Sequence, residues 1–591
     1  MQQLTGLDAS FLYLETGTTP MHVGSLCIYD QSTAPGGHVT FKEIIRFFEE
    51  RLHKAKTFRR RLASVPLGLA RPYWIEDPDF DLEFHLRHIA LPKPGDWRQL
   101  CILTARLLAR PLDLNRPLWE CWVIEGLDNV DGVPPGSFGL VTKIHHSAID
   151  GISGAEIAAA IHSLTPHDQP EPPHREWSAE REPTEVELLA RSAAGMAQTP
   201  LKVGKLLRHV APRVPKLAVG LVRRDIDLPR RVPRTRFNAN VSAHRVFDAR
   251  SFALDEIRGI KGFVEGSTVN DVVVSVCGGA LRKYLQSKGE LPEESLVAMA
   301  PVSVRPDDRR RAEGNMVSAM RLPVGSDIED PLDRLRSVHA ASVEAKRFTR
   351  TAGPELNMEL AEFLPTTTSG LIAKAYGRWH LAERLPPMFN TVITNVPISN
   401  HPLYSMGTKM VAYYGLGPVV HGVGLFQPVI GYNGRIFVSV VSCREMMPDP
   451  AFYCECLQES FDELKEATIG RKPRAVVEGG RPAKKRATRR KAKKKAGSNN
   501  ETSKKKASKK KASKKKVSKK KVSKKKSGSK KKSGSKKAGK KKAIAKKAAR
   551  RKKAGSTRSG SAKKSSTAKA GSRKRTKTRR KKSAGGRAKT G

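Results

Sequence analysis

The residues best suited to chemistry lie where one apolar run of the sequence ends in two adjacent histidines. His145 and His146 follow that run, and Asp150 and Gly151 come shortly after them. An imidazole titrates close to neutral pH, so it is the usual side chain for proton transfer under physiological conditions. An imidazole near a carboxylate, without an obvious nucleophile, suits a base that activates a bound hydroxyl directly, without a covalent enzyme intermediate.

Several other kinds of site do not fit the sequence. Adjacent histidines lack the i, i+4 spacing of a helical zinc site, and neither HExxH nor paired CxxC occurs, so we predict no metal site. A GxSxG elbow, a Walker A loop and a dinucleotide-binding glycine fingerprint are also missing, which argues against a serine hydrolase and the common nucleotide-binding folds. The histidine pair alone remains ambiguous, because such a pair near an aspartate is more often structural than catalytic.

The element that must position the histidines is predicted to be a strand over residues 138–146. Successive strand side chains point to opposite faces, so the two imidazoles should face different surroundings. We expect at most one of them to transfer a proton, while the other holds the loop. A helix capped by Ser153 with Glu156 should follow.

The rest of the first 165 residues alternates strand and helix patterns, which is typical of a mixed α/β fold. Strands are predicted over residues 24–29 and 118–124. Capping boxes at Thr40 with Glu43, and at Asp96 with Gln99, predict the start of two helices. We therefore assign residues 1–165 to a first domain.

A second α/β domain is predicted over residues 241–470. Residues 166–240 form a Pro-rich linker and a basic amphipathic connection, for which a helical connection packed across the body is favoured over a lipid-bound segment. The predicted elements of the second domain are helices from Leu254, over residues 270–285 and from Pro450, a strand over residues 296–304, and a type I′ hairpin at Asn433-Gly434.

The charge of the chain is concentrated in residues 471–591. This tail holds 56 of the 110 Lys and Arg residues but 2 of the 57 acidic residues, which leaves residues 1–470 with a net charge of −1. It contains no Phe, Trp, Tyr, Leu or Met, so we predict that it is disordered. Such a polycation binds nucleic acid through counterion release, and it is also attracted to anionic lipid.

Cysteine usage and the hydrophobic runs bear on location. The seven cysteines are scattered and odd in number, which argues against a disulfide framework and favours a reducing, cytoplasmic setting. The first residues lack the basic and apolar regions of a signal peptide, and no apolar run approaches the ~18 residues of a membrane span. We therefore expect a cytoplasmic protein that is not secreted and has no transmembrane segment.

The string from His145 to Gly151 resembles the HHxxxDG signature of the bacterial wax ester synthase/acyl-CoA:diacylglycerol acyltransferase family, a group of CoA-dependent acyltransferases. Further resemblances follow in the family's order, at residues 7–24, at the PLW element of residues 116–119, at the TVNDV helix start of residues 268–272, and at residues 301–305, 314–315 and 395–397. The similarity covers about residues 1–468 and leaves out the tail.

The resemblance implies two α/β domains similar to chloramphenicol acetyltransferase, with a tunnel between them for acyl-CoA and a hydroxyl acceptor. It implies that His146 is the general base, acting on diacylglycerol or a fatty alcohol, with acyl-CoA as co-substrate and no other cofactor. Asp150 would support the loop through an arginine, for which Arg305 is a candidate.

The remaining candidates are substrate-binding residues with open alternatives. Gly151 would let the chain turn tightly into the helix. Asn270 would steady an oxyanion or the acyl-CoA, but capping of its helix explains it equally well. Ser303 and Arg305 would line the channel, although an ordinary strand end accounts for them too.

The leading hypothesis is an O-acyltransferase that makes triacylglycerol, wax ester or both. We expect it to work at the periphery of the inner membrane face or at lipid inclusions, with the tail as a tether. The alternatives place the function in the tail, as a polyanion- or DNA-binding protein, or in a coat on lipid inclusions.

Overall fold

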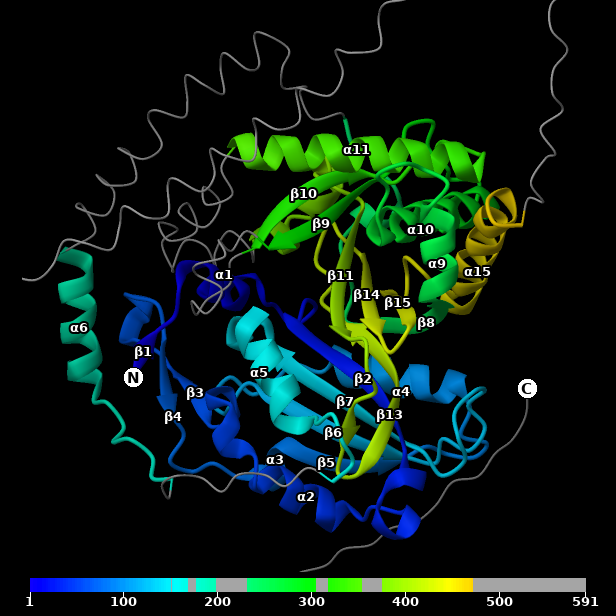
Figure 1. Ribbon diagram of the computed structural model, residues 1–591. Coiled ribbons are helices and arrows are strands. Elements are labelled where there is room, and N and C mark those ends of the chain that lie inside the picture. Colours follow the sequence, from blue (N-terminus) through cyan, green and yellow to red (C-terminus); the bar gives the residue numbers. More distant parts are fainter. Residues whose placement is uncertain (150, 168–176, 198–230, 304–316, 353–374, 471–591) are drawn as a thin grey trace, which may run out of the picture. The chain divides into compact units, whose positions relative to one another are not determined.

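The computed structural model describes residues 1–149, 151–167, 177–197, 231–303, 317–352 and 375–470 (Figure 1). The described chain is a mixed α/β fold built on two six-stranded sheets and one small three-stranded sheet. This confirms the predicted α/β class. The basic segment around residues 201–224 and the whole tail of residues 471–591 lie outside the described residues.

The first sheet has the order β12-β13-β2-β7-β6-β5. Its strands are β2 (His22–Asp30), β5 (Leu86–Ala90), β6 (Trp119–Glu125), β7 (Phe138–His145), β12 (Tyr404–Ser405) and β13 (Thr408–Leu416). All neighbouring strands run antiparallel except β5 and β6, which are parallel. The helices of this part of the chain are α1 (Gly6–Leu14), α2 (Phe41–Glu49), α3 (Leu82–His85), α4 (Trp97–Ala109), α5 (Gly151–Ile161) and α6 (Glu185–Ala197).

The second sheet has the order β10-β9-β11-β14-β15-β8. Its strands are β8 (Arg245–Ala253), β9 (Val297–Ser303), β10 (Val317–Pro323), β11 (Thr391–Ser399), β14 (Leu425–Tyr432) and β15 (Arg435–Cys443). β11 is parallel to both of its neighbours, and the other pairs are antiparallel. The helices here are α9 (Leu254–Lys261), α10 (Val269–Ser287), α11 (Pro331–Ala352), α14 (Leu381–Arg384) and α15 (Pro450–Ala467).

Short elements complete the described chain. The three-stranded sheet, ordered β1-β4-β3, consists of β1 (Gln2–Gln3), β3 (Arg60–Ala63) and β4 (Tyr73–Glu76). The 3₁₀ helices are η1 (Gln31–Thr33), η2 (Pro35–Gly37), η3 (Leu52–Lys54), η4 (Lys56–Phe58), η5 (Pro66–Gly68), η6 (His146–Ala148) and η7 (Arg236–Asn238).

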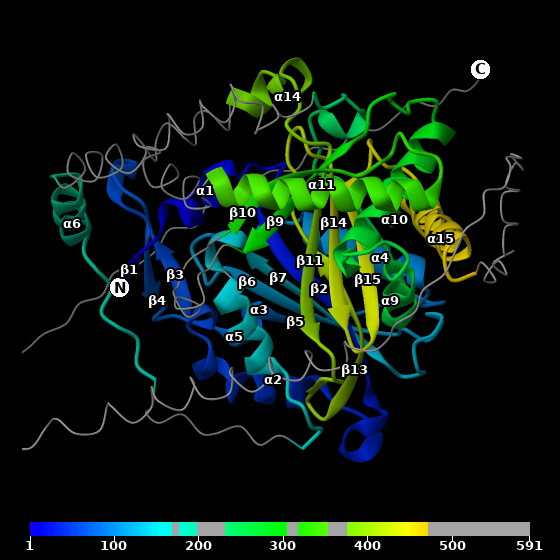
Figure 2. The same cartoon turned by 45° about the horizontal axis from the view of Figure 1, so that its top comes forward.

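A strand from late in the chain completes the first sheet. The chain leaves β11 in the second sheet, pairs β13 with β2 in the first, and then returns to the second sheet as β14. The green-yellow β13 can be followed beside the blue β2 in Figures 1 and 2. The return needs a close approach, since a methyl group on Gly417 would lie 2.3 Å from the ring of Phe426.

Local signals account for most element boundaries. The predicted capping boxes of α2 and α4 both form, because each cap side chain binds the N3 amide while the N3 side chain binds back. Asn433 and Gly434 have φ values of 43° and 75°, as a type I′ turn requires. The prediction for α5 was wrong at its start, because this helix begins at Gly151 rather than after Ser153.

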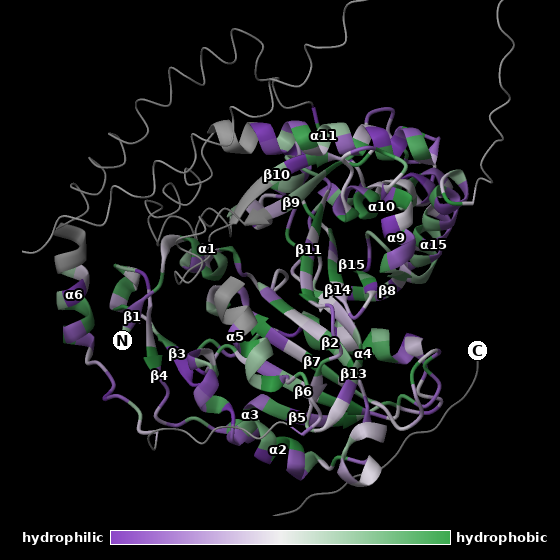
Figure 3. Ribbon diagram, in the orientation of Figure 1, coloured by the Kyte–Doolittle hydropathy of each residue, from purple (hydrophilic) through white to green (hydrophobic). Residues whose placement is uncertain are grey.

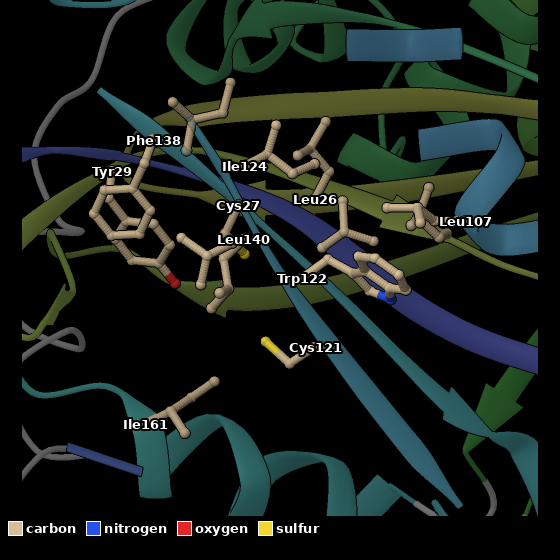
Figure 4. Close-up of a cluster of buried hydrophobic side chains, with 14 of the residues drawn as sticks. Leu26, Cys27, Tyr29, Leu107, Cys121, Trp122, Ile124, Phe138, Leu140 and Ile161 are labelled. Atoms are coloured by element: carbon tan, nitrogen blue, oxygen red, sulfur yellow. The ribbon is translucent and has the colours of Figure 1, made fainter. Parts of the chain in front are cut away.

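Two cores lie against the sheets. One surrounds the first sheet and also takes in Phe247 and Phe437 from the second, while the other surrounds the buried helix α10. Figure 3 shows hydrophobic residues along the strands of the first sheet, and Figure 4 shows Tyr29 and Phe138 side by side in its core. Their ring centroids are 5.2 Å apart, which fixes β2 against β7 close to the start of the strand that carries the histidines.

The cysteines and the hydrophobic helices bear on the predicted setting of the protein. All seven cysteines are buried, and none of them is paired in a disulfide. Within the described ranges, no helix combines the length and the apolar character needed to cross a bilayer.

Candidate active site

The end of β7 fixes the backbone of both histidines. The N–H of His145 donates to the carbonyl of Leu118 (2.9 Å), on the β6 side, and the N–H of His146 donates to the carbonyl of Met21 (2.8 Å), on the β2 side. The chain then turns through η6. The two residues therefore hydrogen bond to opposite neighbours, although the strand ends at His145 and His146 already belongs to η6.

His145 is completely buried, and both of its ring nitrogens have partners. The Nδ1 atom accepts the backbone N–H of Ser147 (3.0 Å) and lies 2.7 Å from the hydroxyl of the same residue. The proton therefore sits on Nε2, which donates to Oε2 of Glu15 (2.9 Å). An imidazole with both nitrogens engaged holds the η6 turn, and this geometry supports a structural role for His145.

Glu15 lies directly after α1 and faces a second histidine. Its Oε1 atom is 3.7 Å from Nε2 of His22, the residue paired with His145 across β2 and β7. Burial, together with the nearby Lys143 and His145, lowers the pKa of His22 well below its ordinary value, so this ring is neutral.

His146, the first residue of η6, lies against α1. Its ring stacks on Phe11, with centroids 3.8 Å apart and planes inclined by 14°. Its Nδ1 atom is buried and has no hydrogen-bond partner among the described residues. Burial is the main cause that lowers the pKa of His146, to about 4, and the neighbouring His145 adds to it. At neutral pH this imidazole is uncharged and able to accept a proton.

Residues 16–19 form a turn between α1 and β2, directly after Glu15. Thr16 and Thr19 exchange backbone hydrogen bonds, and their hydroxyls are 2.7 Å apart. The buried guanidinium of Arg245, from β8, donates to the carbonyl of Thr18. A residue of the second sheet therefore holds the turn that begins directly after Glu15.

The other predicted site residues fall into three groups. Asp150 and Arg305 lie outside the described residues, so their proposed partnership stays a prediction. Gly151 is the first residue of α5, and Ser303 is the last residue of β9. Asn270 is the second residue of α10.

Asn270 does not cap its helix. Thr268 is the N-cap, and it forms a reciprocal capping box with Asp271, so the capping explanation for Asn270 was wrong. The Oδ1 atom of Asn270 instead accepts a hydrogen bond from Nδ2 of Asn395 (3.3 Å), on β11. This hydrogen bond joins two segments, residues 268–272 and 395–397, that both resemble motifs of the family. The sequence had given no contact between them.

Sequence reasoning gave no role to Glu15, His22 or Phe11, although all three lie in the opening segment singled out above. The contact between Glu15 and His145 spans 130 positions of the chain, so no spacing rule could have revealed it. Within the described residues, no cluster of three or more His, Cys, Asp or Glu side chains is arranged to hold a metal ion.

Comparison with known proteins gives matches along the whole body of the chain. The model of the wax ester synthase/diacylglycerol acyltransferase catalytic domain matches residues 4–273, and the model of the C-terminal domain of the same family matches residues 313–465. Two *Mycobacterium tuberculosis* relatives, provisionally named diacylglycerol O-acyltransferases, are 33% and 32% identical over 79% and 78% of this chain, and over 91% and 98% of their own lengths.

A solved structure is similar as well. The wax ester synthase/diacylglycerol acyltransferase from *Marinobacter aquaeolei* VT8 is 28% identical to this chain. The match covers 79% of this chain and 99% of the other, with a TM-score of 0.56.

Proposed function

Because this chain belongs to the wax ester synthase/diacylglycerol acyltransferase family and is an acyltransferase, we propose that it moves a long-chain acyl group from acyl-CoA to a lipid hydroxyl. The acceptor is diacylglycerol, giving triacylglycerol, or a fatty alcohol, giving a wax ester. The observation that carries the proposal is the uncharged imidazole of His146, fixed at the end of β7 and stacked on Phe11.

His146 acts as the general base in this proposal. Its ring takes the proton of the acceptor hydroxyl while that oxygen bonds to the thioester carbonyl carbon. The tetrahedral intermediate collapses as the carbon–sulfur bond breaks, and the imidazolium returns its proton to the CoA sulfur. A thiol of pKa ~8.5 leaves readily, whereas a hydroxyl resembling water, of pKa ~15.7, needs the base.

The low pKa of His146 describes the site without substrate. During the reaction a negative charge develops on the carbonyl oxygen, and a nearby anion stabilises an imidazolium. The basicity of the ring therefore rises as the intermediate forms. The ring can then take the proton of the hydroxyl, although it is a weak base in the absence of substrate.

Direct transfer is preferred over an acyl-enzyme intermediate. All seven cysteines are buried, and burial raises the pKa of Cys27 and of Cys277 to about 12. A thiol of that kind has almost no thiolate at neutral pH and is a poor nucleophile. The sequence also lacks a GxSxG elbow.

The neighbouring residues are assigned supporting roles. Asn270 uses its oxygen to accept from Asn395, which leaves its amide group as a donor toward the oxyanion or the acyl-CoA. Asp150 supports the loop that follows the histidines, with Arg305 as its candidate partner. Gly151 allows the turn into α5, and Ser303 and Arg305 line the path of the substrate.

The test is an acyl-transfer assay with purified protein. Labelled palmitoyl-CoA is incubated with diacylglycerol or with hexadecanol, and the lipid products are separated. We expect labelled triacylglycerol, wax ester or both from the wild type, and a loss of about 10²–10⁴-fold in His146→Ala. His38→Ala, at an exposed histidine, should keep full activity. Near-normal turnover by a folded His146→Ala protein would remove His146 from the reaction.

A further inference from the structure

The segment before β11 exposes large apolar side chains. Trp379, Leu385 and Met388 have 61%, 48% and 72% of their surface exposed, and all three fall within residues 379–388. We call this stretch the 379–388 segment. Figure 2 shows its helix, α14, at the periphery of the fold. Single exposed apolar residues are common on protein surfaces, but a cluster of this kind in one short segment indicates an interaction site.

Hydrogen bonds to the body fix the backbone of this segment. The guanidinium of Arg234 donates to the carbonyl of Ala382 (2.8 Å) and to that of Leu385. The side-chain amide of Asn240 donates to the carbonyl of Gly377 (2.9 Å), two residues before the segment. The exposure of the apolar side chains is therefore a property of an anchored loop and not of a fraying end.

The charges beside the apolar residues are mainly positive. Arg378 and Arg384 are exposed, whereas the exposed Glu383 is paired with His380 at 3.2 Å. An exposed tryptophan flanked by arginines is typical of a lipid interface, where the ring sits at headgroup level and the guanidinium meets the phosphate. The composition fits a phospholipid surface better than a second apolar protein face.

We propose that the 379–388 segment docks the enzyme on a phospholipid-covered lipid surface. The inference rests on the proposed function, since diacylglycerol, fatty alcohols and their esters partition into lipid and must be met there. The apolar side chains enter the interface, and Arg378 and Arg384 lie at the level of the phosphates.

The docking segment is also connected to the candidate active site. A methyl group on Gly377 would lie 2.8 Å from Nε2 of His421, so the loop packs against that ring. Nδ1 of His421 accepts the backbone N–H of Val241 (3.2 Å). The other ring nitrogen, Nε2, lies 3.4 Å from the hydroxyl of Thr18. Thr18 belongs to the turn that follows Glu15, so the chain just before the 379–388 segment is joined through His421 to that turn.

Vesicle flotation tests the docking role in the full-length protein. The vesicles are made of phosphatidylcholine, and the salt is ~1 M, where a screening length of about 3 Å suppresses the contribution of the basic tail. The docking variant carries Trp379→Ser, Leu385→Ser and Met388→Ser. The control carries Leu67→Ser, Val186→Ser and Val343→Ser, at apolar residues of similar exposure elsewhere.

We expect the docking variant to lose at least ~10-fold in vesicle affinity, because three apolar side chains no longer leave water. The control variant should stay within about 2-fold of the wild type. Unchanged vesicle binding by the docking variant would overturn the proposal. So would a change in its oligomeric state in lipid-free solution, because the segment would then be an interface with a second copy of the chain.

A second measurement does not depend on the triple variant. Brominated phosphatidylcholine should quench the fluorescence of wild-type protein more than that of Trp379→Phe, and equal quenching would contradict insertion of this ring. Transfer from a short-chain acyl-CoA to a water-soluble alcohol separates the two proposals. If the wild type binds vesicles through the segment but transfers no acyl group, only the proposed function is contradicted. If it transfers the acyl group but does not bind vesicles through the segment, only this inference is contradicted.

Discussion

At the residue scale, two adjacent imidazoles differ because of the atoms around their nitrogens. Ser147 and Glu15 occupy both nitrogens of His145, whereas His146 has an apolar ring on one face and a buried Nδ1 atom without a partner. Hydrogen bonding fixes the tautomer of the first ring, and desolvation keeps the second ring neutral. We therefore propose that the carboxylate of Glu15 is a positioning group, acting through His145 on the turn that begins at His146.

Removal of the Glu15 carboxylate tests this role. Glu15→Ala leaves the N–H of His145 buried without an acceptor, so we expect a loss of about 1–3 kcal/mol in the free energy of unfolding. The kcat should fall while the KM for acyl-CoA changes little, and Glu15→Gln, which keeps an acceptor oxygen, should recover part of both losses. Glu49→Ala, at an exposed glutamate, serves as the control. Wild-type kcat in Glu15→Ala would show that the contact does not position the base.

The pKa of His146 predicts the pH dependence of activity. The ring acts as a base only when deprotonated, and its pKa is lowered from 6.5 to about 4. The kcat/KM should therefore be level above pH 6 and fall, by one proton, as the pH approaches ~4. A midpoint near 6.5 instead would indicate that His146 is not desolvated in the free enzyme.

The same shift predicts how stability depends on pH. The pKa values of His146 and His162 are both lowered to about 4 in the folded protein, from 6.5. Their unfolded forms bind protons first, so the stability they contribute is complete above pH 6.5 and is lost as the pH falls from there toward 4. Thermal unfolding followed from pH 7.5 to 4.5 should show a falling midpoint, and an unchanged midpoint would contradict burial of these rings.

At the element scale, the pairing of β2 with β7 determines where the histidines lie. Gly24 is a position where these strands leave no room for a side chain, since a methyl group there would lie 1.9 Å from the carbonyl oxygen of Thr142. A side chain would push the strands apart two positions away from the pair of His22 and His145. The geometry of the site therefore depends on a glycine that takes no part in the chemistry.

Substitution of this glycine gives a prediction with an internal control. Gly24→Ala should destabilise the protein by about 3 kcal/mol or more and reduce acyl transfer, because backbone rather than a flexible side chain must move. Gly17→Ala introduces the same methyl group where nothing lies within 4 Å, and it should change the unfolding midpoint little. Chemical denaturation of both variants checks this. Equal stabilities would show that β2 and β7 can separate at low cost.

At the scale of the whole molecule, the charge of the chain is separated from its candidate active site. The described residues end at Gly470 and contain the site, whereas the basic residues of the tail lie within residues 471–591. We propose that the tail tethers the enzyme to anionic lipid or nucleic acid and takes no part in acyl transfer. Binding through the tail and binding through the 379–388 segment should differ in their salt dependence. Salt screens the electrostatic attraction of the tail but not the burial of apolar side chains.

Truncation separates these activities. A protein of residues 1–470 should keep wild-type kcat on soluble substrates, while its binding to anionic vesicles and to DNA at low salt should fall by at least ~10-fold, since the Lys and Arg residues of the tail are removed. Flotation and a DNA mobility assay with both proteins check this. Loss of catalysis together with binding would contradict the separation.

The sequence by itself determined the local features of this protein. The capping boxes of α2 and α4 and the Asn433-Gly434 turn each depend on residues within three positions of one another, so the chain needs no distant partner to form them. The HHxxxDG string, together with the other segments that resemble the family, likewise indicated the family that the comparisons show. The start of α5 was misplaced by three residues, since the helix begins at Gly151 and not after Ser153.

Only the tertiary structure decided which distant segments meet. β13 joins the first sheet, Glu15 binds His145, and Asn395 binds Asn270, in each case across more than a hundred positions of the chain. Many other strands in the sequence could pair with β2, and many other carboxylates could accept a hydrogen bond from His145. Which of them do so depends on the packing of the whole chain, because a long-range contact forms only where many others together offset the entropy of closing its loop.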